Sequence, residues 1–189
     1  MIKKQIRKTF LTARANLSMQ EMHQYLAIML AHFQQLPLAD INCVLSYLPL
    51  TEKGEPTPQY FEELLDENFT GYQLCFPKTN FEDYSMEAIA DDENLELITG
   101  KYGITEPFNG KIIAPERIDL IFVPLVAFDI KGFRVGYGKG FYDRFIPRCR
   151  KNVLTIGLSF FPPVDEIADV NEFDIPLKYC ITPQQLYEF

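Results

Sequence analysis

A glycine-rich segment, DLIFVPLVAFDIKGFRVGYGKGFYDR, holds the side chains of this sequence that are best suited to chemistry. Its loop contains Gly136, Gly138 and Gly140, with Lys139 inside the loop and Arg134 just before it. Glycines at alternate positions let backbone N–H groups approach an anion closely, and the N-terminus of a following helix favours negative charge. These features predict a phosphate site. The alternative is a tight strand-to-helix turn with a solvated lysine.

Asp143 follows the loop in the first turn of the expected helix, where it can complete a magnesium shell together with phosphate oxygens and waters. The loop lacks the Gly-x-x-x-x-Gly-Lys-Ser/Thr spacing of a Walker A loop and the Gly-x-Gly-x-x-Gly spacing of a dinucleotide site. The four cysteines form no Cys-x-x-Cys pair, so we expect buried free thiols in a reducing cytoplasm and no zinc or iron–sulfur site.

Four other residues carry charges that can serve a ligand. Lys3 and Arg7 lie one helical turn apart, and no acidic residue precedes Glu21, so they form either a ligand-binding face or a solvated one. Glu55 lies in the loop after the first strand, where it either binds a polar ligand or is solvated. Asp174 has apolar neighbours on both sides, so it either points into a site or caps a turn.

The elements that must position these residues alternate between helices and apolar strands. This order predicts an α/β layered fold with a mainly parallel sheet, in which ligands bind at the carboxyl ends of the strands. We expect helices over 3–16, 19–35, 58–67 and 140–150. We expect strands over 41–48, 72–76, 117–124, 153–160 and 178–182, a hairpin within 84–98 and a final helical turn over 183–189.

Length and composition limit the class of protein. The 189 residues are 47% apolar, which predicts one domain over residues 1–189. The net charge of -8 disfavours general binding to nucleic acid, which requires clustered Lys and Arg. No apolar run approaches the roughly 20 residues of a membrane span, and the basic start lacks the apolar segment of a secretory signal. We therefore expect a cytoplasmic protein without a membrane partner.

The glycine-rich segment resembles the 5-formyltetrahydrofolate cyclo-ligase family, also called methenyltetrahydrofolate synthetases. That family has a strand that ends in Pro, then Ala-Phe-Asp, a Gly, an Arg and a Gly-x-Gly-x-Gly-Tyr-Tyr-Asp-Arg run. Phe141 stands here for the usual Tyr, which keeps the ring and loses a hydroxyl. The matching residues are Val123-Pro124, Ala127-Phe128-Asp129, Gly132, Arg134 and Gly136-Tyr137-Gly138-Lys139-Gly140-Phe141-Tyr142-Asp143-Arg144.

The resemblance extends over nearly the whole chain. Residues 3–7 look like the Lys-x-x-x-Arg that contacts ATP, and Gly54-Glu55 looks like the start of a folate-holding Gly-Glu-x-Asp-Thr, although Thr57 and Pro58 depart from it. Asp174 falls where the family has an Asp that helps to hold magnesium. Further matches are Phe76-Pro77-Lys78 and Tyr102-Gly103-Ile104-Thr105-Glu106-Pro107, while a Gln common after the Gly157 strand is absent.

The resemblance implies a three-layer α/β/α sandwich, similar to the sugar-phosphate isomerase and CoA-transferase group. It also implies a monomer that closes 5-formyltetrahydrofolate to 5,10-methenyltetrahydrofolate with ATP and Mg²⁺. The implied metal ligands are Asp143 and Asp174, and the implied catalytic residues are Lys139, Arg134 and Arg144. The implied ATP contacts are Lys3, Lys4, Arg7, Arg134, Gly136, Tyr137, Gly138, Lys139, Gly140, Phe141 and Tyr142, and the implied folate contacts are Glu55, Tyr137, Gly138, Lys139, Gly140 and Phe141.

Two other functions remain compatible with the residues alone. One is a non-catalytic sensor of a phosphorylated metabolite on a related fold, although the chain leaves no obvious room for a DNA-binding appendage. The other is a small-molecule kinase, against which the missing Walker A loop weighs. Formation of the methenyl chromophore from ATP and 5-formyltetrahydrofolate would distinguish the three.

Overall fold

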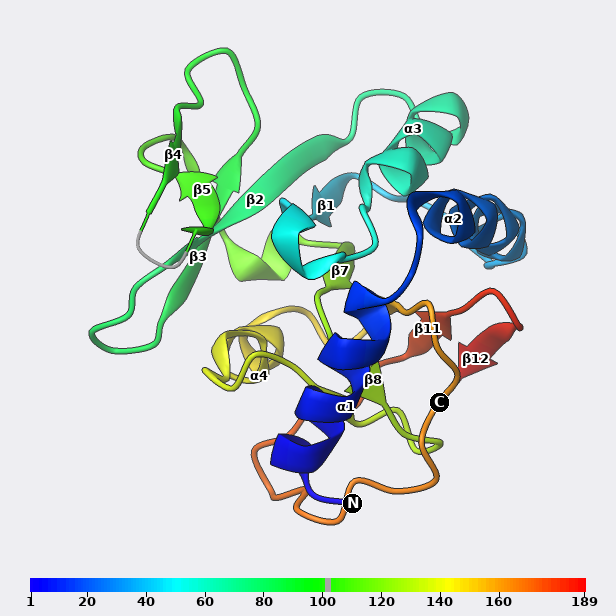
Figure 1. The fold of residues 1–189 in the computed structure, drawn as a ribbon. Helices are drawn as coiled ribbons and strands as arrows, with labels where there is room; N and C mark the ends of the chain where they lie inside the picture. The colour runs from blue at the N-terminus through cyan, green and yellow to red at the C-terminus, as the bar shows by residue number, and fades with distance from the viewer. Residues whose placement is uncertain (101–102) are drawn as a thin grey trace.

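An eight-stranded sheet forms the centre of the computed structural model, which describes residues 1–100 and 103–189 (Figure 1). Its five central strands are parallel, and one antiparallel strand pairs with each side of this group. In spatial order the strands are β12 (Leu186–Glu188), β11 (Tyr179–Ile181), β10 (Leu154–Leu158), β7 (Leu120–Val123), β1 (Cys43–Leu45), β2 (Gln73–Thr79), β3 (Met86–Ala90) and β6 (Ile112–Ile113).

Helices cover both faces of this sheet, as the α/β/α sandwich requires. On one face lie α2 (Met19–Phe33) and α3 (Gln59–Asn68), which pack through buried apolar side chains such as Phe33 and Phe61. On the other face lies α4 (Phe141–Phe145), whose Phe145 joins the second core cluster. The fold class expected from the sequence is therefore confirmed. Among the described residues, no helix has the length and apolar character that a membrane span needs.

The start of α2 shows how local sequence sets an element boundary. The Ser18 hydroxyl accepts a hydrogen bond from the Glu21 backbone N–H at 3.2 Å, and the Glu21 carboxylate accepts one from the Ser18 N–H at 2.8 Å. This capping box satisfies N–H groups that have no partner within the helix. The expected helix start at residue 19 is confirmed.

Helix α1 (Lys3–Ala15) belongs to neither layer. It packs instead against a small hairpin of β8 (Ala127–Phe128) and β9 (Arg134–Val135), which follows the carboxyl end of β7. Its apolar face places Ile6 in a buried cluster with residues of this hairpin. Figure 1 shows α1 lying beside β8, away from α2 and α3. The sequence predicts the helix correctly but not the hairpin, which lies within a segment expected to be a loop.

Two expected elements are wrong in their pairing or type. The stretch 84–98 is not a hairpin, because β3 pairs with β2 and β6, while β4 (Leu97–Thr99) pairs with β5 (Thr105–Pro107). The buried apolar side chains of β3 place that strand in the central sheet. The final helical turn is instead β12, because pairing with β11 satisfies its backbone groups.

Two elements that contain or precede a proline differ in length from the sequence prediction. Strand β2 continues through Pro77, where the sequence predicts its end. Its pairing with β1 stops at Cys75, so the missing N–H of Pro77 lies beyond the β1 ladder. Helix α4 has only five residues, because the chain tightens into a 3-10 turn that contains Pro147. The helix expected over 140–150 is therefore much shorter, and its dipole contributes less to an anion site.

Candidate active site

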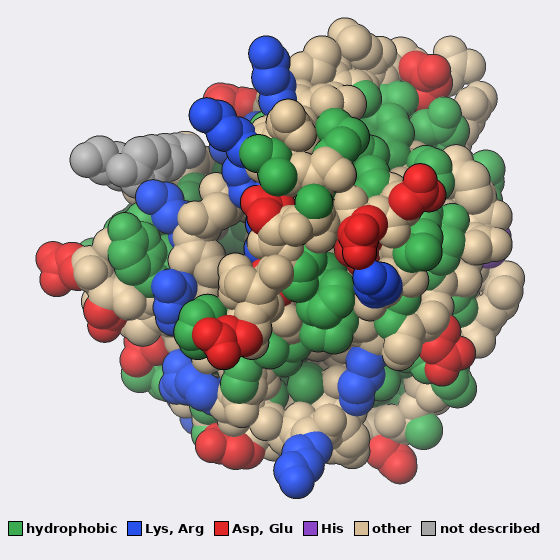
Figure 2. All heavy atoms as spheres, turned by 90° about the horizontal axis from the view of Figure 1, so that it is seen from below, with side chains coloured by type: hydrophobic (Ala, Val, Ile, Leu, Met, Phe, Trp, Pro, Cys, Tyr) green, Lys and Arg blue, Asp and Glu red, His purple; other side chains and the backbone are tan. Residues whose placement is uncertain are grey.

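A cavity of about 1130 Å³ lies where β1, β2 and β7 end at their carboxyl sides. Figure 2 shows a hollow bordered by Lys and Arg side chains on this face. The position is the one expected for ligands in a parallel α/β sheet. Among the lining residues are Lys3, Arg7, Tyr47, Lys53, Glu55, Thr79, Phe81, Glu106, Arg134, Gly136, Tyr137, Gly138, Lys139, Gly140, Phe141, Tyr142, Asp143, Arg144, Phe173 and Asp174.

The glycine loop (Gly136–Gly140) needs glycine at two positions, where φ is positive and an arginine side chain lies close to the backbone. Gly138 has a φ of +91°, and a Cβ there would lie 3.4 Å from an Arg7 guanidinium nitrogen. Gly140 has a φ of +69°, and a Cβ there would lie 2.9 Å from Arg144 Nη1. Arg7 also donates from Nε to the Gly136 carbonyl at 2.7 Å. The loop is thus shaped around two arginine side chains.

Lys139 lies at the rim of the cavity, where it is exposed. Its Nζ is 5.7 Å from the centroid of the Tyr84 ring, and the Arg144 guanidinium carbon is 5.5 Å from the same centroid. Arg144 also donates to the Lys139 carbonyl at 2.8 Å. These contacts are weak and solvent-exposed, so both cations are available to a phosphate that enters the cavity.

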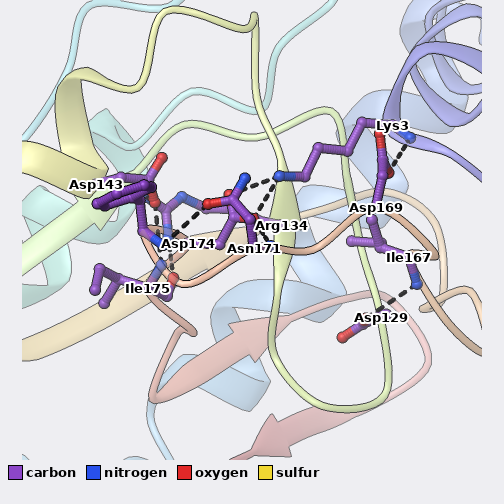
Figure 3. Close-up of polar contacts among 10 residues, drawn as sticks. Lys3, Asp129, Arg134, Asp143, Ile167, Asp169, Asn171, Asp174 and Ile175 are labelled. Carbon is purple, nitrogen blue, oxygen red and sulfur yellow. Dashed lines mark hydrogen bonds and ion pairs between the residues drawn. The ribbon is translucent and has the colours of Figure 1, made fainter.

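Two ion pairs form what we call the charged end of the cavity: Lys3, Arg134, Asp143 and Asp174. Lys3 Nζ lies 2.6 Å from both Asp174 carboxylate oxygens, and Arg134 Nη2 lies 2.7 Å from Asp143 Oδ1. Figure 3 shows Lys3 reaching from α1 to Asp174, with Arg134 and Asp143 beside them. Burial lowers the pKa of the Arg134 guanidinium, and the two carboxylates oppose this shift. The structure thus brings these four residues together at one end of the cavity.

The carboxylates of the charged end fit a magnesium ion that arrives with phosphates. Among the described residues, no group of three His, Cys, Asp or Glu side chains can hold a metal. Magnesium is commonly bound by one or two carboxylates, with phosphate oxygens and waters as its remaining ligands. Asp143 and Asp174 both line the cavity and supply the hard oxygen donors of such a shell. Their present partners are cations that a phosphate group can also bind.

Glu55 is a buried carboxylate that contacts the glycine loop through Tyr137. Its Oε1 accepts a hydrogen bond from the Tyr137 hydroxyl at 2.5 Å, and its Oε2 accepts one from the Leu50 N–H at 2.7 Å. Burial raises the pKa of Glu55, while these hydrogen bonds and the charges of Arg14 and Lys53 oppose the shift. The carboxylate is 9% exposed and lines the cavity, so it is not a solvated loop residue.

Aromatic side chains line the cavity as well, and we group four of them with Glu55 as the aromatic end: Tyr47, Glu55, Phe81, Phe141 and Tyr142. Phe81 and Phe141 pack edge to face, with ring centroids 5.2 Å apart. The Tyr142 hydroxyl is buried and has no hydrogen-bond partner among the described residues. Burying a hydroxyl without a hydrogen-bond partner costs free energy, so binding of a ligand that accepts a hydrogen bond from Tyr142 would be favoured. Flat rings of this kind suit a flat aromatic ligand.

The structure separates the predicted residues from residues that sequence reasoning missed. Lys4 is exposed on α1 and does not line the cavity. Arg14 was not predicted, although it lies seven residues after Arg7 on the same helical face, which is a signal that could have found it. Arg14 lies behind the cavity, whereas Lys53 and Phe81 line it, and no spacing pattern identifies these two residues.

The 102–107 motif lies only partly within the described residues. Tyr102 lies outside them, together with its neighbour at position 101. Ile104, Thr105 and Glu106 line the cavity. The Glu106 carboxylate accepts hydrogen bonds from the Thr79 hydroxyl at 2.7 Å and from the Thr79 N–H at 3.0 Å. Glu106 therefore fixes the end of β2 beside the cavity.

Comparison with sequences of known proteins identifies one family. Residues 1–183 match the profile of the 5-formyltetrahydrofolate cyclo-ligase family. The 5-formyltetrahydrofolate cyclo-ligase of Escherichia coli K12 is 35% identical over 97 residues, which is 50% of this chain and 53% of the relative. The mouse protein of the same name is 28% identical over 126 residues, covering 60% of this chain and 62% of the relative. The matched segments thus span about half to three fifths of the curated relatives.

Solved structures extend the similarity over the whole fold. The Aquifex aeolicus 5,10-methenyltetrahydrofolate synthetase is similar with a TM-score of 0.78 and 32% identity, over 100% of this chain and 93% of that one. The Mycoplasma pneumoniae 5,10-methenyltetrahydrofolate synthetase has a TM-score of 0.75 and 25% identity, over 96% of this chain and 98% of that one.

Proposed function

We propose that this chain, which belongs to the 5-formyltetrahydrofolate cyclo-ligase family, uses ATP to close 5-formyltetrahydrofolate to 5,10-methenyltetrahydrofolate, releasing ADP and phosphate. The observation that carries the proposal is the union of a charged end and an aromatic end in one cavity. Its volume of about 1130 Å³ exceeds the ~300–1,000 Å³ typical of a site for one small ligand. The cavity therefore has room for a nucleotide and a folate together.

The chemistry explains the need for both substrates in one cavity. An N-formyl oxygen is a poor leaving group. In the proposed reaction this oxygen attacks the terminal phosphorus of ATP, and the bond from that phosphorus to ADP breaks. N10 of the folate then attacks the formyl carbon, the carbon–oxygen bond to phosphate breaks, and N10 loses its proton. Ring closure and phosphate release complete the balance.

The charged end and the glycine loop would bind the nucleotide. Phosphoryl transfer needs positioning and charge neutralisation more than covalent help from the protein. We assign Lys139, Arg134 and Arg144 to the oxygens on which negative charge shifts during transfer. Lys3 and Arg7 would bind the triphosphate from α1, because both line the cavity beside the glycine loop.

Asp143 and Asp174 would hold a magnesium ion that accompanies ATP. When bound, the ion neutralises charge on phosphate oxygens. In this arrangement Lys3 exchanges the Asp174 carboxylate for a phosphate oxygen, so its ammonium keeps an anionic partner. The exchange costs little, because both members of this ion pair are partly exposed.

The aromatic end would hold the pterin ring. Tyr47 and Phe141 provide apolar walls, and the buried Tyr142 hydroxyl can donate to an acceptor on the substrate. Each Glu55 oxygen already accepts one hydrogen bond and retains a second lone pair, so it can accept another from a substrate N–H. The pterin would then lie across the glycine loop from the triphosphate.

We further propose that the protein acts as a cytoplasmic monomer. All four cysteines are free thiols, as a reducing cytoplasm favours. Size-exclusion chromatography with light scattering would test the oligomeric state at assay concentration. A dimer at that concentration would contradict the monomer.

The direct test of the function is formation of the methenyl chromophore when the protein is mixed with ATP, magnesium and 5-formyltetrahydrofolate. We expect product only when ATP is present, together with one phosphate released per ring closed. Glu55→Gln should lose about 10- to 100-fold in kcat/KM for folate, because a hydrogen bond to a charged acceptor is lost. Glu52→Gln is the matched control, because Glu52 is exposed and lies outside the cavity lining.

Two outcomes would contradict this function and support its rivals. Binding of both compounds without product would favour a sensor. Phosphate transfer to a small molecule without the chromophore would favour a kinase. Phosphate and absorbance measured in the same reaction separate these outcomes from the proposed one.

A further inference from the structure

We propose that Arg14 is a positioning residue for the folate half of the reaction, which acts through Tyr137 to keep the Glu55 carboxylate ionised and correctly oriented. Arg14 does not line the cavity, so it reaches the substrate only through other side chains. The inference rests on the proposed function, because it gives Glu55 a folate to bind.

Arg14 is a buried cation without a direct anionic partner. It lies on α1 and is 1% exposed. Its Nη2 donates to the Leu125 carbonyl at 2.8 Å and to the Val126 carbonyl at 3.5 Å, while Nε has no partner among the described residues. None of the ion pairs among the described residues includes Arg14. Burying an unpaired charge is expensive, so its retention calls for a function.

Within residues 1–100 and 103–189, the one side chain that Arg14 contacts through a hydrogen bond leads to Glu55. Its Nη1 lies 3.4 Å from the Tyr137 hydroxyl oxygen, and the same hydroxyl donates to Glu55 Oε1 at 2.5 Å. The guanidinium therefore polarises the tyrosine, which strengthens the bond that the tyrosine donates. The Arg14 guanidinium is thus linked to the Glu55 carboxylate, which lines the cavity, through the Tyr137 hydroxyl alone.

The groups that face Glu55 come from every element around it. Arg14 on α1 and Lys53 before the Gly54 turn are the cations, and Tyr47, Tyr137 and Tyr142 are neutral hydroxyl groups. Burial raises the pKa of Glu55. The hydrogen bonds from the Tyr137 hydroxyl and the Leu50 N–H oppose this rise most, and the two cations oppose it further. Lys53 is exposed, whereas Arg14 is buried, so solvent screens Arg14 least.

The stem of Arg14 also shapes the loop that carries Glu55. Gly54 has a φ of +59°, and a Cβ there would lie 3.2 Å from Arg14 Cγ. The chain therefore closes over the arginine just before the carboxylate. Arg14 thus fixes both the path of the backbone and the charge behind its side chain.

The test compares Arg14→Met with Arg14→Lys across pH, measuring kcat and KM for each substrate. In Arg14→Met, kcat/KM for folate at neutral pH should fall about 10- to 100-fold while KM for ATP changes less than threefold. Loss of the nearby cation should raise the pKa of Glu55. Because the proposed activity requires ionised Glu55, the acid limb of the pH profile of kcat/KM for folate should move to higher pH. Arg14→Lys should restore the position of this limb in part.

A double-mutant cycle with Tyr137→Phe tests whether the hydroxyl carries the effect. If Arg14 acts through Tyr137, the combined variant should lose little more than the worse single variant. Arg148→Met is the matched control, because Arg148 also donates to a backbone carbonyl, that of Met86 at 3.2 Å, but its side chain lies over the Phe145 ring and not beside Tyr137. It should leave the pH profile unchanged.

Three results would overturn the proposal: equal losses toward ATP and folate, an acid limb that does not move, or additive effects in the cycle. If Arg14→Met fails to fold, the Arg14→Lys and Tyr137→Phe variants decide the question, through the pH at which the acid limb of their folate profiles lies. If the wild type forms no product, the proposed function fails instead. Calorimetric binding of 5-formyltetrahydrofolate across pH then decides whether Arg14 still controls a folate site.

Discussion

The charged end and the aromatic end of the cavity differ in how far their polar groups are already paired within the protein. At the charged end, Lys3 and Arg134 each lie within 3 Å of a carboxylate that neutralises them. At the aromatic end, the Tyr142 hydroxyl has no partner among the described residues, and Glu55 is held at a raised pKa by burial. One end is electrostatically satisfied before a ligand arrives, and the other is not.

This difference separates how the two ligands gain affinity. A triphosphate must replace the carboxylates that already neutralise Lys3 and Arg134. Its net gain in binding free energy therefore comes from better geometry and from the glycine-loop amides. A pterin gains by satisfying groups that the fold leaves costly. Changes at the charged end should therefore act on turnover and ATP, and changes at the aromatic end on folate and on pH dependence.

The largest effect is expected from Lys139→Ala. Its ammonium is the cation inside the glycine loop, and charge on the nearby phosphate oxygens shifts during transfer, so part of its contribution arises only in the transition state. We expect kcat to fall about 10²–10³-fold. The melting temperature should barely change, because the side chain is exposed and its ring contact with Tyr84 is long.

Lys139→Arg should recover only part of the loss, because a planar fork does not replace a compact ammonium. Steady-state kinetics and thermal unfolding of both variants check the prediction. A folded alanine variant with near-normal turnover would make Lys139 a solvated turn residue after all.

Asp143→Asn should come next, and it should affect both magnesium use and stability. The amide is a poorer ligand for magnesium, so the concentration needed for half-maximal activity should rise about tenfold. It also leaves the buried Arg134 without its carboxylate, which we expect to cost about 1–3 kcal/mol because Asp143 is partly exposed. Magnesium titrations and urea unfolding measure the two effects, with the exposed Asp165→Asn as control. An unchanged magnesium requirement would refute the metal role.

Arg7→Ala should raise KM for ATP about tenfold and leave KM for folate nearly unchanged. The guanidinium donates to Gly136 and packs on Gly138, so its removal loosens the glycine loop on the nucleotide side. Lys8→Ala is the matched control, because Lys8 is exposed on the same helix. Kinetics with each substrate varied in turn provide the measurement. A larger change in KM for folate than for ATP would reverse the assignment of the two ends.

The smallest effect concerns the stability cost of Glu55. Because its pKa is raised on folding, its contribution is most favourable below the unfolded pKa and is lost as the pH rises through the folded pKa. The melting temperature of Glu55→Gln minus that of the wild type should therefore increase between pH 4 and pH 8, by a few degrees. Thermal unfolding across this range checks the sign. A difference that does not change with pH would mean that burial does not control this carboxylate.

The same two ends show what the sequence can predict. The glycine loop, Arg134 and Asp143 lie within one short segment, so local chemistry and chain order are sufficient to place them together. Asp174 was left open between pointing into a site and capping a turn. Its carboxylate lines the cavity, where it pairs with Lys3, and it also accepts the Asn171 N–H at 2.7 Å. The aromatic end was only partly predicted, because Tyr47 and Phe81 reach the cavity from the segments that follow the neighbouring strands β1 and β2, and sequence spacing does not show this.

The errors in the fold have a related cause. The pairing of β3 and the type of β12 were predicted wrongly, because strand pairing in the folded sheet overrides local sequence preference. The buried Arg14 resembled an ordinary helix charge, since burial depends on where the β8–β9 hairpin lies. Helix starts with a capping box and buried parallel strands were predicted well, because each carries its own local signal.

The placement of α1 outside the two helical layers links its folding to ligand binding. The helix is attached at Lys3, Arg7 and Arg14, and every one of these contacts leads to the cavity or to the segment that follows β7. A nucleotide that bound only the docked helix would lower the population of undocked molecules by mass action. Backbone amides of α1 should then exchange with deuterium more slowly when ATP is present, while those of α2, on the far layer, keep their rates.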